Sequence, residues 1–340
     1  MGNKVHKMPP VHVEPDRPDA PLLEVKNETP QGFETWVGVA GVQGRRATME
    51  DATIVSQKDG LIFLGVFDGH GGSDTSNTLA ATFPSMVLSG YPSSKPFAKR
   101  KDYLITKTKE MDQTLFHFED GSTAVFGILS LTDKWLDVGN LGDSRLVVIY
   151  KDGTIKTTED HKPEDIAERK RISRAGGFVT CHPIPPKHQG GPPARMCRVN
   201  GNLATSRAFG DFHMGLKPEL PGEDSLKYAV SDVPEVYERF LPNANFIVLA
   251  CDGLWDVMVN EEVAQFLSAN KDQSPFDLAS ALVTKAYDKG STDNISVVVV
   301  DLSKGPFSVA PPAKGQPRPI KGQPRPTKGR HRSRSIEAKV

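Results

Sequence analysis

The chain of 340 residues carries 42 basic and 42 acidic residues, so its formal net charge at pH 7 is zero. A balanced charge gives no overall attraction to nucleic acid or to an anionic membrane, and we expect no nucleic-acid partner. The apolar content of 37% is sufficient for a substantial core, and the length fits one large domain or two ordinary ones.

The three cysteines are Cys181, Cys197 and Cys251, and they form no CxxC pair. This spacing argues against a zinc ribbon and against a disulfide scaffold, and it favours a reducing compartment. No apolar run approaches the roughly 20 residues that span a bilayer, and the N-terminus lacks the apolar segment of a secretory signal. These features indicate an intracellular, soluble protein.

The two ends of the chain differ in composition from its middle. Residues 1–32 are polar and rich in proline, and we expect a disordered arm there. Residues 304–340 are basic and rich in proline and glycine, and the hexamer KGQPRP begins at both Lys314 and Lys321. Such a composition cannot bury a core, so we expect a disordered tail after a folded domain over residues 33–303.

Short apolar runs separated by tight turns follow one another in the middle of the chain. Tight turns such as Lys151-Asp152-Gly153 join antiparallel strands, and runs without clean alternation indicate strands covered on both faces. The expected strands lie within residues 61–68, 122–131, 134–142, 145–150, 154–158, 245–252 and 294–302.

Helical patterns lie between these runs. Start and stop signals, such as Pro163 and the pair Gly176-Gly177, support them. The expected helices span residues 73–88, 97–118, 163–175, 259–269 and 275–287. Antiparallel strands with helices on their outer faces predict an α+β fold, a four-layer α-β-β-α sandwich of two antiparallel sheets.

Acidic residues recur at the ends of the apolar runs or beside glycine turns. One such residue has ordinary explanations, such as a helix N-cap, an Asx turn or an arginine partner, but a whole set makes these explanations strained. Hard divalent ions prefer oxygen ligands, and the usual spacings of zinc ligands are missing. The sequence therefore predicts a binuclear Mg²⁺ or Mn²⁺ centre with ions roughly 3.5–4 Å apart. The acidic residues are Glu50, Asp51, Asp68, Asp143, Asp252, Asp256 and Asp293.

Seven segments in a fixed order identify a family. Together they closely resemble the metal-dependent PP2C (PPM) class of serine/threonine protein phosphatases, over about residues 34–302. The resemblance implies hydrolysis of phosphoserine and phosphothreonine by a metal-bridging hydroxide, without a phosphoenzyme. The segments are RRATMEDA, FDGHGG, GSTAV, GDSR, RVNGNLATSRAFGD, ACDGLWDV and STDNISVVVV.

The same resemblance assigns the metal ligands. Asp68 bridges two Mg²⁺ or Mn²⁺ ions, Asp252 and Asp293 complete the ligands of the first, and Glu50 with the carbonyl of Gly69 serves the second. The resemblance further implies that Asp51 holds a water and that Asp143 with Asp252 and Asp256 forms a weaker third site.

The resemblance also assigns two catalytic residues beside Asp68. Arg46, not its neighbour Arg45, matches the arginine that binds the substrate phosphate, and its planar fork suits phosphate oxygens. His70 matches the proposed general acid, which would protonate the departing serine or threonine oxygen.

Structural roles also explain several other features of the sequence. His161 is expected to fix the turn before the helix at Pro163, and Cys251 to be a core residue. Residues 177–198 form a proline- and glycine-rich flap, either a substrate-selecting element or a tolerated insertion. Two other functions remain open: a catalytically weak phosphoprotein-binding regulator with the same fold, and a hydrolase of small phosphate esters.

The expected partners are phosphorylated proteins, and we expect a monomer. Gly2 and the basic tail leave peripheral membrane association through acylation open, although His6 stands where an acylation signal normally has Ser or Thr. The expected location is cytoplasmic, with nuclear import or membrane association as alternatives.

Overall fold

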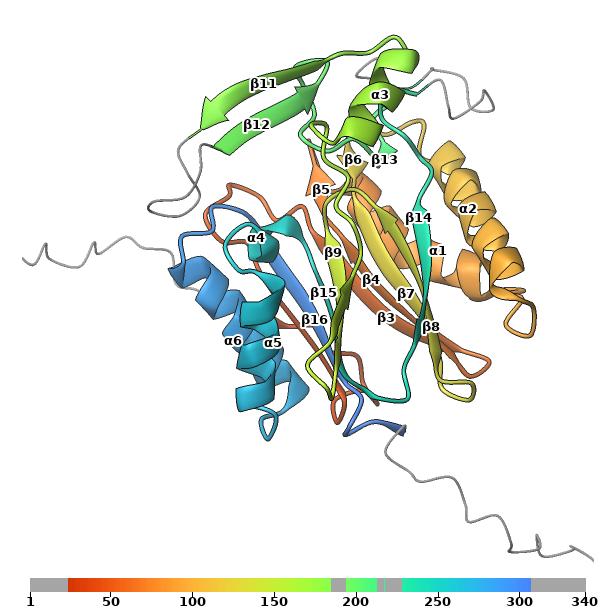
Figure 1. Cartoon of the computed structure of the whole chain (residues 1–340), viewed down its shortest axis with the longest axis vertical. Coiled ribbons are helices and arrows are strands. Elements are labelled where there is room, and N and C mark those ends of the chain that lie inside the picture. Colours follow the sequence, from red (N-terminus) through yellow and green to blue (C-terminus); the bar gives the residue numbers. More distant parts are fainter. Residues whose placement is uncertain (1–23, 185–193, 213–216, 218–227, 307–340) are drawn as a thin grey trace, which may run out of the picture. The chain divides into compact units, whose positions relative to one another are not determined.

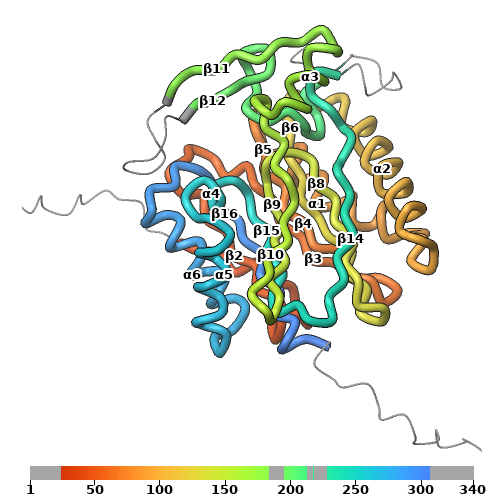
Figure 2. The backbone as a smooth tube through the Cα atoms, in the orientation of Figure 1, coloured from red at the N-terminus to blue at the C-terminus, as the bar shows by residue number. Residues whose placement is uncertain are grey.

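The computed structural model describes residues 24–184, 194–212, 217 and 228–306 (Figures 1 and 2). Four expectations from the sequence concern residues outside the described ones. They are those for Gly2, for residues 1–23 of the arm, for the basic tail from residue 307 and for the middle of the flap.

Two antiparallel sheets form the centre of the fold. Neighbouring strands in each are antiparallel throughout, as the tight turns predict. The six-stranded sheet has the order β1 (Lys26–Asn27), β2 (Val37–Val42), β16 (Ile295–Asp301), β15 (Ala244–Ala250), β9 (Arg145–Tyr150), β10 (Ile155–Thr157). The five-stranded sheet has the order β14 (Glu235–Phe240), β8 (Trp135–Leu141), β7 (Ala124–Ser130), β4 (Leu61–Phe67), β3 (Ala52–Lys58).

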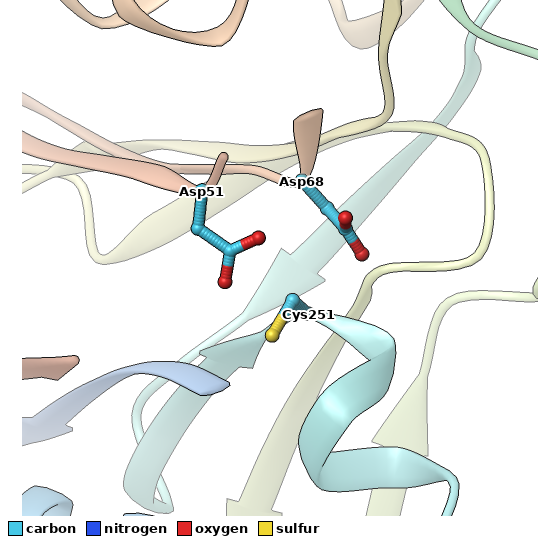
Figure 3. A group of neighbouring side chains, drawn as sticks. All are labelled: Asp51, Asp68 and Cys251. Atoms are coloured by element: carbon cyan, nitrogen blue, oxygen red, sulfur yellow. The ribbon is translucent and has the colours of Figure 1, made fainter. Parts of the chain in front are cut away.

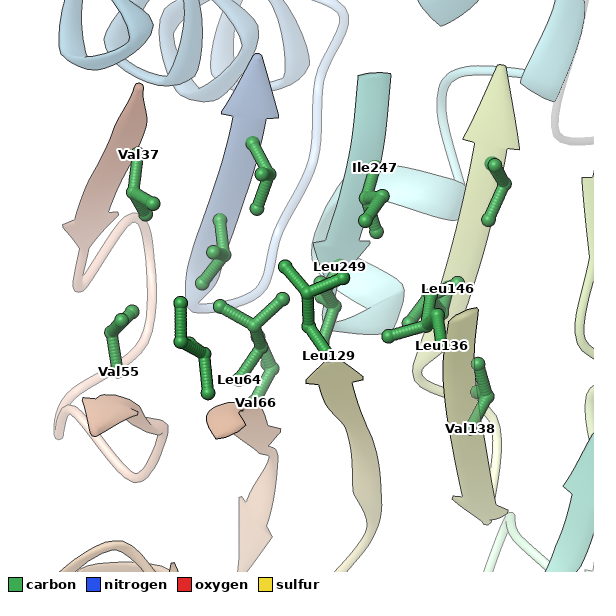
Figure 4. Packing of buried hydrophobic residues seen from close by; sticks show 14 of the residues in the cluster. Val37, Val55, Leu64, Val66, Leu129, Leu136, Val138, Leu146, Ile247 and Leu249 are labelled. Carbon is green, nitrogen blue, oxygen red and sulfur yellow. The ribbon is translucent and has the colours of Figure 1, made fainter. Parts of the chain in front are cut away.

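The core between the sheets is built from alternate residues of their strands. In β16, Val298 and Val300 face the other sheet, whereas Val297 and Val299 pack on the opposite face against the helices. Figure 4 shows the two inner faces meeting, with Ile247 on one side and Leu64 on the other. Because both faces of these strands are buried, their sequences read as almost continuous apolar runs.

Helices cover both outer faces, which confirms the α-β-β-α sandwich (Figure 1). Helices α5 (Asn260–Ala269) and α6 (Pro275–Asp288) pack on the six-stranded sheet. Helices α1 (Asp74–Leu88) and α2 (Phe97–Thr114) pack on the five-stranded sheet. None of the helices in the described part of the chain is long and apolar enough to cross a membrane.

Two helices are shorter than expected, for a local reason. Helix α3 (Ile166–Arg174) begins after Pro163, because the amide of Lys162 donates to Asp165 Oδ2 and closes a turn there. Helix α2 ends at Thr114 because the following residues form tight turns, with the amide of Leu115 bonded to Asp112. The four-residue helix α4 (Asp252–Trp255) was not expected.

The expected arm is shorter in the structure, since β1 lies within residues 1–32 and pairs with β2. The folded part also continues past residue 303, where the ammonium of Lys304 pairs with Asp301 at 2.9 Å.

The cysteine expectation needs correction. Cys181 and Cys197 form a disulfide, and Cys251 is a buried free thiol. The flap is a hairpin of β11 (Val179–Ile184) and β12 (Ala194–Val199), in which Cys181 lies opposite Cys197. Sequence spacing missed this pair because the hairpin register, not a short motif, brings the two residues together.

Candidate active site

The predicted acidic residues gather at one end of the two sheets. Asp68 follows β4, Asp143 links β8 to β9, Asp252 follows β15, and Asp293 precedes β16. Since neighbouring strands run antiparallel, these chain ends and starts share the same edge of the sandwich. A small sheet of β13 (Phe209–Gly210), β6 (Gly121–Ser122) and β5 (Gly69–His70) lies at the same end.

Asp68 and Asp252 are partly buried carboxyls surrounded by other acidic residues. Burial, followed by repulsion from Asp252, raises the pKa of Asp68 well above its usual range. Burial, followed by repulsion from Asp143, does the same to Asp252. Among the described residues, neither forms an ion pair. Such an arrangement favours added cations, and the all-oxygen donors fit Mg²⁺ or Mn²⁺.

Asp51 extends this acidic centre inward. Its Oδ2 atom is buried without a hydrogen-bond partner in the described part of the chain, and burial raises the pKa of the carboxyl to about 7. Ligand atoms of Asp51, Asp68 and Cys251 lie within 4.8 Å of one another (Figure 3). The thiol of Cys251 is already held by the backbone, since Ser296 N donates to Sγ at 3.2 Å. Its core role is thus confirmed.

Two cations of the chain pair with acidic residues of the centre. Arg46 Nη2 donates to Asp293 Oδ2 at 2.5 Å, and Lys162 Nζ donates to Asp143 Oδ2 at 2.5 Å. The Arg46 side chain is 54% exposed, so its remaining guanidinium donors stay accessible to a substrate. Arg45 instead donates to the carbonyl of Tyr287 and stacks on that ring, 4.1 Å from its centre.

The backbone of Glu50 is clamped against Gly69. A Cβ atom on Gly69 would lie 2.3 Å from the carbonyl oxygen of Glu50, so only glycine allows this approach. Asn294 Oδ1 accepts from the Glu50 amide at 2.9 Å, and Ser76 Oγ donates to the Glu50 carbonyl at 2.5 Å. The Glu50 carboxylate accepts a hydrogen bond from Thr48 at 2.9 Å. The sequence argument missed the role of Asn294, which sits beside Asp293 in STDNIS.

His70 is held by a residue that the sequence argument did not single out. Its Nε2 atom lies 2.9 Å from Asp211 Oδ1, and Asp211 is fully buried. A Cβ atom on Gly121 would lie 2.4 Å from His70 Nε2, so the small sheet needs glycine here. Burial lowers the pKa of His70, but the Asp211 carboxylate more than offsets it, and the net direction is upward. The available signal was the Gly-Asp pair ending RAFGD.

Asp256 lies one helical turn beyond Asp252, and its amide donates to the Asp252 carbonyl at 2.8 Å. A cavity of about 200 Å³ opens beside it and is also lined by Asp293, Lys289 and Ser291. The negative charges of Asp143 and Asp256 both act on the Asp252 carboxyl, and the third metal site stays a prediction.

His161 is structural, as expected. Its Nδ1 atom accepts from the Gly142 amide at 3.1 Å, and its own amide donates to the Gly142 carbonyl at 2.9 Å. This pair ties the segment before α3 to the loop that carries Asp143. Glu168 on α3 then forms a salt bridge with Arg207.

Comparisons with known proteins agree with this geometry. The pattern of the family "Protein phosphatase 2C" matches residues 36–295. The chain is 36% identical to "Protein phosphatase ppm-1.A" of Caenorhabditis elegans over 85% of this chain and 64% of that protein. It is 33% identical to "Protein phosphatase 1B" of Rattus norvegicus over 85% of this chain and 75% of that protein. The chain therefore spans about two thirds to three quarters of these relatives.

A solved structure shares the fold. The crystal structure of a phosphatase from a pathogenic strain of Toxoplasma gondii superposes with a TM-score of 0.64 and 26% identity, over 79% of this chain and 93% of that one. The four-layer sandwich and its carboxylate cluster thus define a class, the protein phosphatases built on this α+β fold. Within that class, the chain belongs to the protein phosphatase 2C family.

Proposed function

We propose that the chain is a Mg²⁺- or Mn²⁺-dependent phosphatase that hydrolyses phosphoserine and phosphothreonine in proteins. The observation that carries the proposal is that Asp68 and Asp252 lie partly buried among like charges, without an ion pair to either in the described residues. Divalent cations would complete such a centre, and a phosphate group would bring its own negative charge to those cations. The protein phosphatase relatives support a phosphoprotein as the substrate.

The ligands that would hold two ions are Asp68 between them, Asp252 and Asp293 on one side, and Glu50 with the Gly69 carbonyl on the other. Bound there, the ions would supply charge neutralisation for the phosphate and a more acidic water as the nucleophile. Asp51 lies behind Asp68, where it would accept a hydrogen bond from a water of the centre.

The chain's own residues then orient and complete the reaction. Arg46 presents a planar pair of N–H donors to the phosphate oxygens and so aligns the phosphorus for in-line attack. His70, two residues after Asp68 in the chain, donates a proton to the departing alkoxide. No phosphoenzyme is needed. The described thiol at the centre, Cys251, is buried and bonded to the backbone.

The test uses the full chain, a phosphoserine peptide and p-nitrophenyl phosphate, each with Mn²⁺ and with EDTA. We expect Mn²⁺-dependent release of phosphate from both substrates and loss of at least about a hundredfold in Asp252→Ala. Asp272→Ala, an exposed aspartate, is the matched control. Activity that persists in EDTA would contradict the metal centre. Hydrolysis of the small ester alone would point to the small-ester hydrolase, and metal binding without turnover to the phosphoprotein-binding regulator.

A further inference from the structure

A lysine lies at the corner of the acidic centre where a third ion would bind. Lys162 Nζ donates to Asp143 Oδ2 at 2.5 Å, and its charge also interacts with Asp252 and Asp256. These three acids are the ones that the family resemblance assigns to a third, weaker metal position. An ammonium therefore occupies one of the two Asp143 oxygens that could bind a divalent ion there.

The lysine is placed by a rigid backbone. The Lys162 amide donates to Asp165 Oδ2 at 3.2 Å, and the Asp165 amide donates back to the Lys162 carbonyl at 3.1 Å. The preceding residue, His161, forms hydrogen bonds with Gly142 in both directions, next to Asp143. The side chain of Lys162 is 29% exposed, so most of its stem is buried and its position is defined.

The other nearby cations are engaged elsewhere. Arg145 is paired with Asp160 at 2.7 Å and donates to Asn260 at 2.8 Å. Arg46 is paired with Asp293. Among the residues that the structure describes, Lys162 is the cation paired with Asp143. Arg46 and Lys162 are thus paired with Asp293 and Asp143, whereas neither Asp68 nor Asp252 forms an ion pair within the described residues.

We propose that Lys162 is a built-in counter-ion that competes with a divalent cation for Asp143 and thereby keeps the third metal position weaker than the two-ion centre. The proposal rests on the metal centre of the proposed function. An ammonium and a divalent ion cannot share one carboxylate oxygen at contact distance, because their like charges repel strongly in a partly buried site. For the third ion to bind, Lys162 must leave Asp143 and turn toward solvent, which costs part of the binding free energy.

The first test counts Mn²⁺ ions by isothermal titration calorimetry and by the electron paramagnetic resonance of free Mn²⁺. In Lys162→Met we expect the third ion to bind about tenfold tighter or more, with the two tight ions within about twofold of the wild type. Lys162→Arg keeps the charge and should resemble the wild type. The matched control is Lys107→Met, because Lys107 pairs with Glu110 on α2 and is 24% exposed.

A second measurement uses the unmodified protein and so does not depend on a variant folding. Reductive methylation followed by peptide mass spectrometry reports the accessibility of each lysine ammonium. Across the range where the third Mn²⁺ binds, methylation of Lys162 should rise, while that of Lys107 should stay constant. Flat or falling methylation of Lys162 would overturn the proposal.

The outcomes separate this inference from the proposed function. If the chain binds no Mn²⁺ at all, the proposed metal centre fails. If two ions bind tightly but the third is unchanged or weaker in Lys162→Met, the competition by Lys162 is wrong and the metal centre stands. Binding of only two ions by every variant likewise overturns the inference alone.

Discussion

His70 Nε2 lies within 2.9 and 3.0 Å of the two carboxylate oxygens of Asp211. Asp211 has no exposed surface, and its backbone adopts a φ of 63°, a conformation that few residues other than glycine accept. Because a carboxylate accepts, Nε2 carries the proton of this bond, and Nδ1 is left to exchange a proton with the substrate. Asp211 is thus a positioning residue for the proposed general acid.

Asp211→Asn should weaken this arrangement without changing the shape of the side chain. We expect turnover of an alkyl phosphate to fall about tenfold to a hundredfold, and turnover of p-nitrophenyl phosphate to fall far less, because an aryl oxide departs without a proton. In the double variant with His70→Ala, no further loss is expected, since both act on one step. Steady-state kinetics on both substrates check this. Equal losses on the two esters would remove Asp211 from the acid role, and Asp102→Asn, at an exposed ion pair, is the control.

The substitution Asp68→Asn should abolish activity without lowering the stability of the metal-free protein. Like-charge crowding and burial raise the pKa of Asp68, so removing its charge relieves repulsion in the metal-free protein. In EDTA we expect the variant to be as stable as the wild type or more stable by roughly 1–2 kcal/mol. Added Mn²⁺ should raise the melting temperature of the wild type and not that of the variant, which should be inactive. A variant that is less stable in EDTA would argue against crowding at this position.

His161 should make the folded state sensitive to mild acid. Burial lowers the pKa of His161 from 6.5 to about 3. Protonation would also turn Nδ1, which accepts from the Gly142 amide, into a second donor. A group whose folded pKa is depressed in this way stabilises the fold above the unfolded pKa, and the contribution is lost as pH falls from about 6.5 toward 3.

As the pH falls from 7.5 to 5.5, His161 should therefore lower the free energy of unfolding of the wild type by about 1.4 kcal/mol. Urea unfolding at both pH values measures this loss. His161→Asn, whose Oδ1 atom is able to accept from Gly142, should lose correspondingly less over the same interval. The same pH dependence in the variant and the wild type would assign the effect to other groups.

The number of reactive thiols tests the flap disulfide directly. Unfolded without reductant, the chain should show one reactive thiol, that of Cys251, and three after reduction. Because Cys181 and Cys197 are 16 residues apart, the bond should stabilise the protein by about 3 kcal/mol over a Cys181→Ser/Cys197→Ser variant. Thiol titration and urea unfolding provide both numbers. Three reactive thiols before reduction would restore the interpretation drawn from spacing alone.

Local sequence was sufficient for much of the fold. Strands β4, β7, β8, β9, β10, β15 and β16 and five of the helices could be located because apolar runs, tight turns and helix signals such as Ser274-Pro275 act over a few residues. Strands β2, β3 and β14 were not among the expected strands. The four-layer sandwich followed from antiparallel turns and the helical segments between them. The acids of the site were recognisable because they recur at the ends of apolar runs or beside glycine turns.

What the sequence could not determine depends on contacts between distant segments. Asp211 meets His70 across 141 residues, and Cys181 meets Cys197 only through the register of a hairpin. The pairing of Lys162 with Asp143 likewise required the His161–Gly142 hydrogen bonds to bring two loops together. Residue type and spacing thus identified the family and the acidic centre, because that information is local. Only the tertiary structure decided which charges neutralise one another, because electrostatic pairing depends on distance in space.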